Sequence, residues 1–354
     1  EIPEAELLDV GIALFDPGLD EANDNEDQVI FPEIRNAETR YIPFMIMETL
    51  QTTAAWGAVR VVPNALSAAD VLVSGKIVHS DGESMKLAVT VKDATGRLWF
   101  TKTYEEMVSY YAYDPRKNVS KDPFQGLYNR IANDLYMFKG KMASKDILAV
   151  RTIAELKFAE DFSPDSFQGH LNQDKKGLYQ IKRLPAEGDP MLDRIRSIRE
   201  RDYLFVDTLQ DYYGAFVRDM ENPYKQWRSQ SYDEVVALRE VERDARNRKI
   251  AGIASILGGI AAAGSDSRAA RTAGNVAVAA GGYMVKSGFD KSSEAKMHVE
   301  ALQELGDSLE AEIEPQVIEL EDRTITLSGT VENQYDQWRS ILKDLYEVET
   351  GSTQ

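Results

Sequence analysis

The residues that most often carry out chemistry are few and scattered in this chain. The three histidines, His79, His170 and His298, lie far apart, and none has the HExxH spacing of a zinc site. The sequence has no GxSxG nucleophile motif, no GxGxxG dinucleotide motif and no P-loop. It has no cysteine, which excludes thiolate nucleophiles, disulfides and Cys-ligated zinc. We therefore expect a non-enzymatic protein with no cofactor and no metal.

The many acidic residues of the chain do not by themselves indicate a site. Asp202 and Asp207 could in principle act as acid and base, but a chain with 59 acidic residues contains such pairs by chance. The acidic segment 16–27 lacks the spacing of a calcium loop and is typical of a hydrated loop. The net charge of −18 disfavours nucleic acid as a partner, because phosphates are bound by clustered Lys and Arg. Any cluster of Lys and Arg that binds anions must therefore be confined to a small part of the surface.

Residues 250–285 differ from the rest of the chain, because they form two runs made almost wholly of Gly, Ala, Ile and Val. Small residues recur every four positions in both runs, which lets two helix backbones approach closely. The residues between the runs, SDSRAART, provide turn and capping chemistry. The segment is therefore predicted to be a glycine-zipper helical hairpin. Its candidate contact residues are Ala251, Ser255, Gly259 and Ala263 in the first run and Ala273, Ala277 and Gly281 in the second.

Length and flanking charge suggest what the hairpin contacts. The first apolar run, 250–264, would span roughly 22 Å as a helix, which suits a bilayer thinner than average, such as the bacterial outer membrane. Four basic residues precede it and could contact anionic headgroups: Arg243, Arg246, Arg248 and Lys249. We expect either membrane insertion or ring-like packing with copies of the same hairpin. A soluble hairpin buried in its own helical domain is the alternative, since short apolar runs are commonly buried.

The part of the chain before the hairpin reads as a small α+β domain followed by helices. Residues 7–15 predict a strand, and 32–53 predict an amphipathic helix with a break near its middle, where Pro43 could open a helix. Strands follow at 58–62, 70–79, 85–93 and 97–104, with a hairpin turn at 94–96. This order favours a small antiparallel sheet with one helix. Helices are predicted at 124–138, at 191–220 and from about Tyr232.

The tail contains one more helix and a small β-β-α unit. A helix is predicted at 293–312, then strands at 317–320 and 324–331, then a helix in which Trp338, Ile341, Leu342 and Leu345 face one way. The predicted division is an α+β assembly domain at 1–110, a helical domain at 111–248, the hairpin at 249–289, and the helix with its β-β-α tail at 290–354.

Two segments resemble known families. VGIALFD, a helix ending near Trp56 and then DVLVSGKIV resemble the amino-terminal domain shared by the curli secretion lipoprotein family and TolB-type periplasmic proteins. This resemblance covers about residues 7–105, carries no catalytic residue and implies a bacterial envelope setting and a role in assembly. TITLSGTVENQYDQW in the tail resembles the strand-then-helix core of the BON domain of envelope and lipid-associated proteins.

Together these features predict a cell-envelope protein that assembles with copies of itself into an oligomeric ring or pore-like complex. We expect it at the outer membrane, facing the periplasm, with membrane contact and with other envelope proteins as further partners. The chain begins at Glu1 without a methionine, which is compatible with removal of a leader or with a lipid anchor. The alternative is a soluble periplasmic scaffolding or binding module.

Overall fold

A computed structural model describes residues 2–19, 32–63, 69–114, 116, 121–260, 316–320, 323–328 and 330–350. For residues 234, 237–260, 316–320 and 323–325 it describes the backbone alone. The elements in chain order are η1 (Glu4–Glu6), β1 (Val10–Ala13), α2 (Pro32–Gln51), β2 (Val59–Val62), β3 (Val71–Ser80), β4 (Ser84–Asp93), β5 (Leu98–Met107), η2 (Tyr110–Ala112), α3 (Gln125–Lys139), α4 (Ser144–Phe162), α5 (Pro164–Phe167), β6 (Leu171–Gln173), β7 (Tyr179–Ile181), α6 (Pro190–Ile260), β8 (Gln316–Leu320), β9 (Arg323–Leu327) and α9 (Val331–Thr350).

The main sheet has five strands in the order β2-β1-β3-β4-β5, which confirms the α+β class and all five predicted strands. The prediction of an antiparallel sheet holds for β3, β4 and β5, but β1 runs parallel to both of its neighbours. The sheet is therefore mixed. The physical reason is the helix between β1 and β2, because a helical crossover returns the chain to the same end of the sheet and brings the next strand in parallel.

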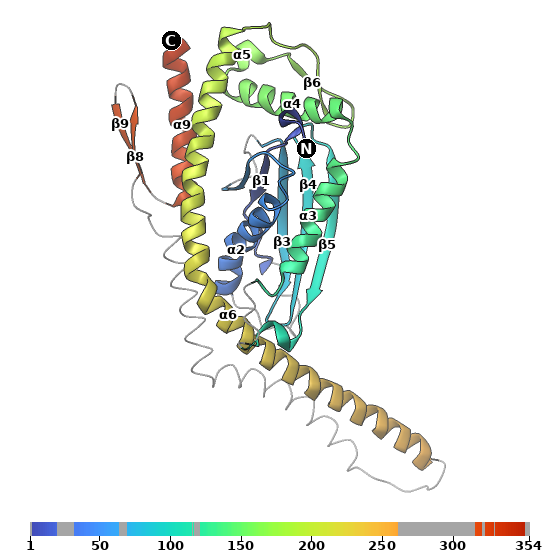
Figure 1. Ribbon diagram of the computed structural model, residues 1–354. Helices are drawn as coiled ribbons and strands as arrows, with labels where there is room; N and C mark the ends of the chain where they lie inside the picture. Colours follow the sequence, from blue (N-terminus) through green and yellow to red (C-terminus); the bar gives the residue numbers. More distant parts are fainter. Residues whose placement is uncertain are drawn as a thin grey trace.

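One face of this sheet is covered by α2 and α3, which pack against each other and against the strands (Figure 1). Strand β4 shows the resulting pattern, since every second side chain from Met85 to Val91 is fully buried. The buried face of α3 is the one that the sequence predicted: Leu127, Ile131 and Leu135 are fully buried. Phe138 stacks on Trp99 of β5 with ring centroids 4.7 Å apart.

Helix α2 continues through Pro43, so the predicted break is wrong. A proline inside a helix leaves the carbonyl four residues earlier without its usual partner. Here that carbonyl belongs to Thr39, and it accepts a hydrogen bond of 3.0 Å from the backbone N–H of Phe15, just after β1. The Thr39 carbonyl, which has no partner within the helix, thus binds the segment that follows β1. This hydrogen bond explains why the helix tolerates the proline.

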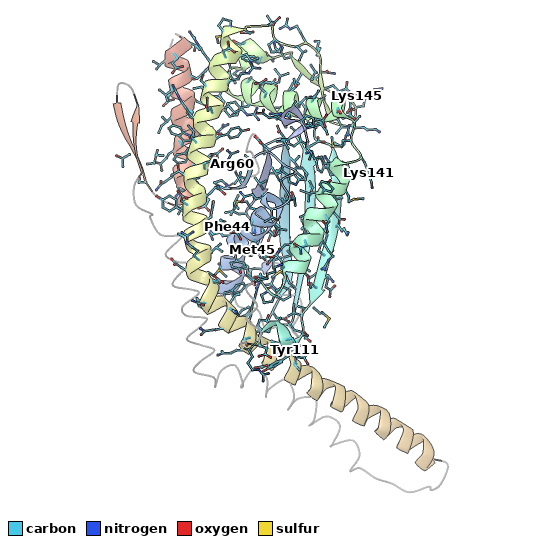
Figure 2. The ribbon with its side chains drawn as sticks, in the orientation of Figure 1. Phe44, Met45, Arg60, Tyr111, Lys141 and Lys145 are labelled. Carbon is cyan, nitrogen blue, oxygen red and sulfur yellow. The ribbon has the colours of Figure 1, made fainter. Side chains whose placement is uncertain are left out.

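Helix α6 covers the β2 edge of the sheet. The side-chain amide of Gln210 accepts a hydrogen bond from the N–H of Val61 at 2.9 Å and donates one to the carbonyl of the same residue at 2.8 Å. Next to it, Arg60 pairs with Asp207 at 2.5 Å and lies over the ring of Tyr203 (Figure 2). Exposed strand edges invite pairing with other chains. The glutamine therefore takes the position that another strand would occupy.

The sequence analysis divided α6 into two helices, whereas the structure has one helix of 71 residues. Pro223 lies inside it, and prolines are a common cause of helix bends. Figure 1 shows α6 following the body and then changing direction as it leaves it. The sequence analysis also missed a hairpin: the turn-rich segment after α5 contains β6 and β7, which pair with each other.

The predicted β-β-α tail is confirmed as β8, β9 and α9, while the predicted helix at 293–312 lies outside the described residues. Trp338 and Leu342 of α9 are buried, and Trp338 stacks on Phe205 of α6 at 5.2 Å. One hydrophobic cluster runs from the sheet through α3 and α6 to α9. The division of the chain at residues 110, 248 and 289 stays a prediction, and within the described residues this cluster includes side chains from both sides of residue 110.

The contact between α6 and α9 predicts a pH dependence of stability. Burial raises the pKa of Asp202 from 3.8 to about 6, although Arg339 and Tyr335 of α9 contact its carboxylate at 3.3 and 3.5 Å. The folded state favours the protonated form of Asp202. The stabilisation that this carboxyl group contributes is therefore complete below about pH 4 and is lost as the pH rises through 6. Asp202→Asn should therefore raise the free energy of unfolding at pH 7.5 by at most about 3 kcal/mol and change it little at pH 4.

Urea unfolding at the two pH values measures this difference. The control is Asp344→Asn on the exposed part of α9, which should leave the pH dependence unchanged. An Asp202→Asn protein that is less stable than the parent at pH 7.5 would contradict the assignment.

Candidate functional site

The structure describes part of the predicted zipper and none of its second run. The described backbone of α6 includes Ala251, Ser255 and Gly259, and it also includes Arg243, Arg246, Arg248 and Lys249. Ala263, Ala273, Ala277 and Gly281 lie outside the described residues. A helical backbone keeps positions 251, 255 and 259 on one side, as a zipper requires. The far end of α6 is therefore the first half of the candidate assembly site.

The hairpin was predicted to contact a membrane. The described residues contain no helix with the length and hydropathy of a membrane span. The second run of the predicted hairpin lies outside the described residues. Membrane contact accordingly stays a prediction.

The arm, defined as α6 from Tyr232 to Ile260, leaves the body at a contact with the β3–β4 turn. Gly82 in that turn lies directly against the helix backbone: a Cβ on it would be 2.0 Å from the carbonyl oxygen of Arg228 and 2.3 Å from the nitrogen of Tyr232. The Gly82 N–H also donates to the hydroxyl of Ser231 at 3.2 Å. Only glycine allows this approach, because any side chain would have to displace backbone atoms.

Tyrosines surround the same point. Tyr113 donates its hydroxyl hydrogen to the Gly82 carbonyl at 2.5 Å, and its ring lies 5.6 Å from the ring of Tyr232 on α6. Tyr110 lies 6.4 Å from the same ring, and Tyr111 is exposed beside it at this end of the body (Figure 2). The start of the arm is thus held between a turn and an aromatic cluster.

One turn earlier in α6, a buried ion pair ties the helix to the body. Arg228 is 1% exposed and donates to Asp122 at 2.8 Å and to the hydroxyl of Tyr224 at 2.7 Å. Asp122 also accepts from the hydroxyl of Tyr41 on α2 at 2.8 Å, and its other oxygen accepts from the N–H of Phe124 at the start of α3. A single carboxylate therefore connects α2, α3 and α6.

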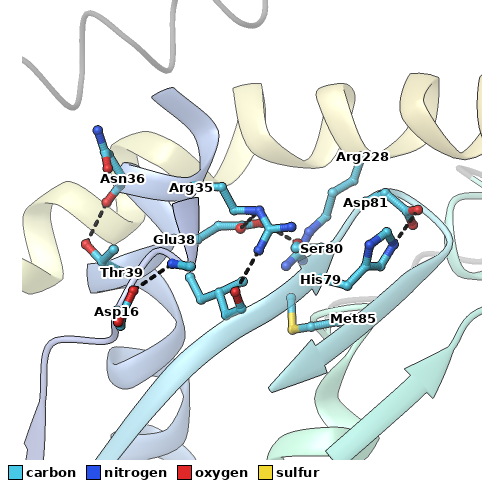
Figure 3. Close-up of polar contacts among 12 residues, drawn as sticks. Asp16, Arg35, Asn36, Glu38, Thr39, His79, Ser80, Asp81, Met85 and Arg228 are labelled. Atoms are coloured by element: carbon cyan, nitrogen blue, oxygen red, sulfur yellow. Dashed lines mark hydrogen bonds and ion pairs between the residues drawn. The ribbon is translucent and has the colours of Figure 1, made fainter. Parts of the chain in front are cut away.

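The network continues to strand β3 through a second buried acid. Glu38 on α2 accepts a hydrogen bond from Tyr224. It also accepts one from Ser80 of β3 and lies 3.9 Å from the Arg35 guanidinium (Figure 3). Arg35 in turn donates to the carbonyl of Ile77 at 3.1 Å. Two arginines and two carboxylates are thus buried together with balanced charge, which is the condition under which buried ions are tolerated.

Burial in this network raises the pKa of its tyrosines. The pKa of Tyr41 is raised by burial and by the neighbouring Asp122 carboxylate. Burial also raises the pKa of Tyr224, while the Arg228 cation opposes the shift. Both phenols are therefore protonated at neutral pH and act as hydrogen-bond donors to the two carboxylates.

The structure does not bring the potential acid-base residues together. Asp202 is buried against α9, whereas Asp207 pairs with Arg60 on β2. His79 contacts Asp81 at 2.8 Å, whereas the neighbouring Ser80 donates to Glu38 (Figure 3). The histidine and the serine therefore have different acidic partners. In the described parts of the chain there is no group of three or more His, Cys, Asp or Glu residues that could hold a metal ion.

Comparison of the chain with protein-family models, with curated proteins and with solved structures finds no match. The resemblances to the curli secretion, TolB and BON families therefore stay predictions.

Sequence reasoning found the zipper but missed the buried network that anchors the arm. Arg228, Asp122 and Glu38 were not singled out, because charged residues in a polar chain are expected to face solvent. One signal was available: Arg228 lies one helical turn after Tyr224, which itself lies one turn after the last residue of the predicted apolar stripe, Met220. The contact of Gly82 with α6 depends on tertiary structure.

The close approach at Gly82 predicts a sensitive position. Gly82→Ala should destabilise the protein by about 1–3 kcal/mol, because the new Cβ would overlap backbone atoms of α6 and must push the turn away. Hydrogen exchange of the amides near Tyr232 should become faster than in the parent protein. Gly140→Ala is the matched control, since the nearest atoms to a Cβ there are 3.4 Å away or more. Equal effects of the two substitutions would show that Gly82 is not a contact point.

The ion pair predicts strong coupling between two positions. Arg228→Met should lower the free energy of unfolding by about 3–5 kcal/mol, because it leaves the Asp122 carboxylate buried without its cation. Adding Asp122→Asn should recover part of that loss. A urea-unfolding double-mutant cycle measures the coupling. Simple additivity of the two substitutions would mean that the two charges act independently.

Proposed function

We propose that this chain is a non-enzymatic envelope protein that assembles with copies of itself through the arm of α6 and the glycine-zipper segment. The observation that carries the proposal is the course of α6. The helix is anchored to the body up to Tyr232 and then extends away from it as far as Ile260 (Figure 1). The backbone positions 251, 255 and 259 of the first zipper run lie on this extension.

The dimensions of the arm support this role. Residues 232 to 260 rise by about 42 Å along a helix axis, and the four basic residues lie about 16 to 26 Å beyond Tyr232. Helices with few tertiary contacts are only marginally stable in water. Packing against the second run, against other copies or in a membrane would supply the missing stabilisation.

The charge of the chain limits where copies can meet. Subunits with a net charge of −18 repel one another over their general surface. Close contact is therefore favoured at a segment that is rich in small apolar residues and preceded by cations, which is the composition of the far end of α6. The anchor at Gly82 and Arg228 would give every copy the same arm direction, as a closed ring requires.

The alternative is a soluble periplasmic scaffolding or binding module whose hairpin packs into its own helical domain. That arrangement needs residues 251–260 to pack against the helices of the body. The course of α6 favours the first proposal, because these residues follow the part of the helix that leaves the body (Figure 1).

The mass of the full-length protein, purified with and without detergent, tests the proposal. We expect a large, uniform, detergent-dependent particle. Gly259→Leu combined with Gly281→Leu should convert it to folded monomers, because leucine prevents close approach of the helix backbones. The control is Asn133→Leu, an exposed position on α3. A monomer that is indifferent to detergent, or an intact oligomer in the double variant, would refute self-assembly through the zipper.

A further inference from the structure

A groove of about 300 Å³ lies between α2 and α6, beside the anchor of the arm. Its apolar walls include Phe44 and Met45 of α2 and Val217 of α6, and Figure 2 labels the first two beside α6. Gly214 lies opposite Phe44, so that a Cβ on the glycine would be 3.4 Å from the ring. This volume is at the lower end of the range for small-molecule sites.

Five charged side chains line the groove and are exposed: Lys121, Arg218 and Lys225, together with Glu48 and Glu221. Within the part of the chain that the structure describes, none of the five forms an ion pair. Partial burial of the Glu48 carboxyl group and then the neighbouring Glu221 carboxylate raise the pKa of Glu48. The groove thus has free charges of both signs along one apolar wall.

The inner end of the groove is formed by the anchor. Arg228 lines it, is 1% exposed, and has an Nε–H group without a hydrogen-bond partner. A buried donor that lacks an acceptor costs free energy, which a ligand oxygen could recover. Lys121, an exposed cation that lines the groove, directly precedes Asp122, the partner of Arg228.

We propose that this groove binds a small zwitterion that carries an apolar group, of which a hydrophobic amino acid is the simplest example. Its carboxylate would lie toward Arg228, Lys121 and Lys225. Its ammonium group would lie toward Glu48 and Glu221, and its side chain would pack against Phe44, Met45 and Val217. Such a ligand would contact α2 and α6 together, and its binding does not depend on self-assembly of the arm.

Calorimetric titration of the full-length protein with phenylalanine and three analogues tests the ligand class. 3-Phenylpropanoate lacks the ammonium group, phenethylamine lacks the carboxylate, and glycine lacks the apolar group. We expect saturable binding of phenylalanine. Each analogue should bind at least about tenfold more weakly, because it lacks the group that would contact the cations, the acids or the apolar wall of the groove. Absence of phenylalanine binding, or glycine that binds as well as phenylalanine, would overturn the proposal.

Charge variants at the exposed positions then test the orientation. Glu48→Gln with Glu221→Gln should weaken phenylalanine and phenethylamine but not 3-phenylpropanoate. Lys121→Gln with Lys225→Gln should weaken phenylalanine and 3-phenylpropanoate but not phenethylamine. Equal effects of both pairs on all three ligands would contradict the orientation.

A substitution that fills the groove provides the last test. Gly214→Leu should abolish phenylalanine binding, because its side chain would extend toward Phe44. Thr208→Leu, at an exposed position of the same helix, should not affect binding. Circular dichroism confirms that both variants fold. Unchanged binding in a folded Gly214→Leu protein would locate the ligand elsewhere and refute this site.

Discussion

The ion pair between Arg228 and Asp122 is the interaction on which the arrangement of the molecule depends. It is buried, and Asp122 is shared by α2, by the start of α3 and by α6. Charges are tolerated in such a position only when each one has its partner. Helix α6 can therefore dock with the Arg228–Asp122 pair fully formed, or it can stay undocked. A partly docked helix would leave one of the two ions buried without its partner. This makes the docking of α6 on the body close to all-or-none, and it fixes the point from which the arm extends.

A second constraint acts within one turn of the first. Gly82 brings the β3–β4 turn into backbone contact with α6 where the arm begins. The ion pair sets how far along the body α6 is held, and the glycine contact sets how closely the helix approaches the sheet. Two unlike interactions, one electrostatic and one steric, thus determine the same orientation. The direction in which residues 243–260 leave the body follows from both.

Much of the fold was predictable because its signals are local. Alternation in β4 and β5, the turn at 94–96, the buried face of α3 and the β-β-α tail depend on neighbouring residues, and the structure has them. The errors arose where tertiary contacts decide the outcome. Pro43 is accommodated because Phe15 binds the carbonyl that the proline leaves unpaired, and the parallel pairing of β1 with β2 follows from the path of α2. The spacing of Arg228 from Tyr224 and Met220 could have indicated a buried position. Its pairing could not be predicted, since an Arg or Glu in a helical pattern gives no sign of a partner more than 80 residues away.

The contact of Gln210 with Val61 links the docking of α6 to protection of the sheet edge. The helix that extends as the arm is the same helix that covers the β2 edge. Any event that lifts this part of α6 from the sheet therefore leaves the β2 edge as an unpaired strand. Uncovered edges recruit other strands and lead to aggregation. Loss of the docked helix and exposure of an aggregation-prone strand are thus one event.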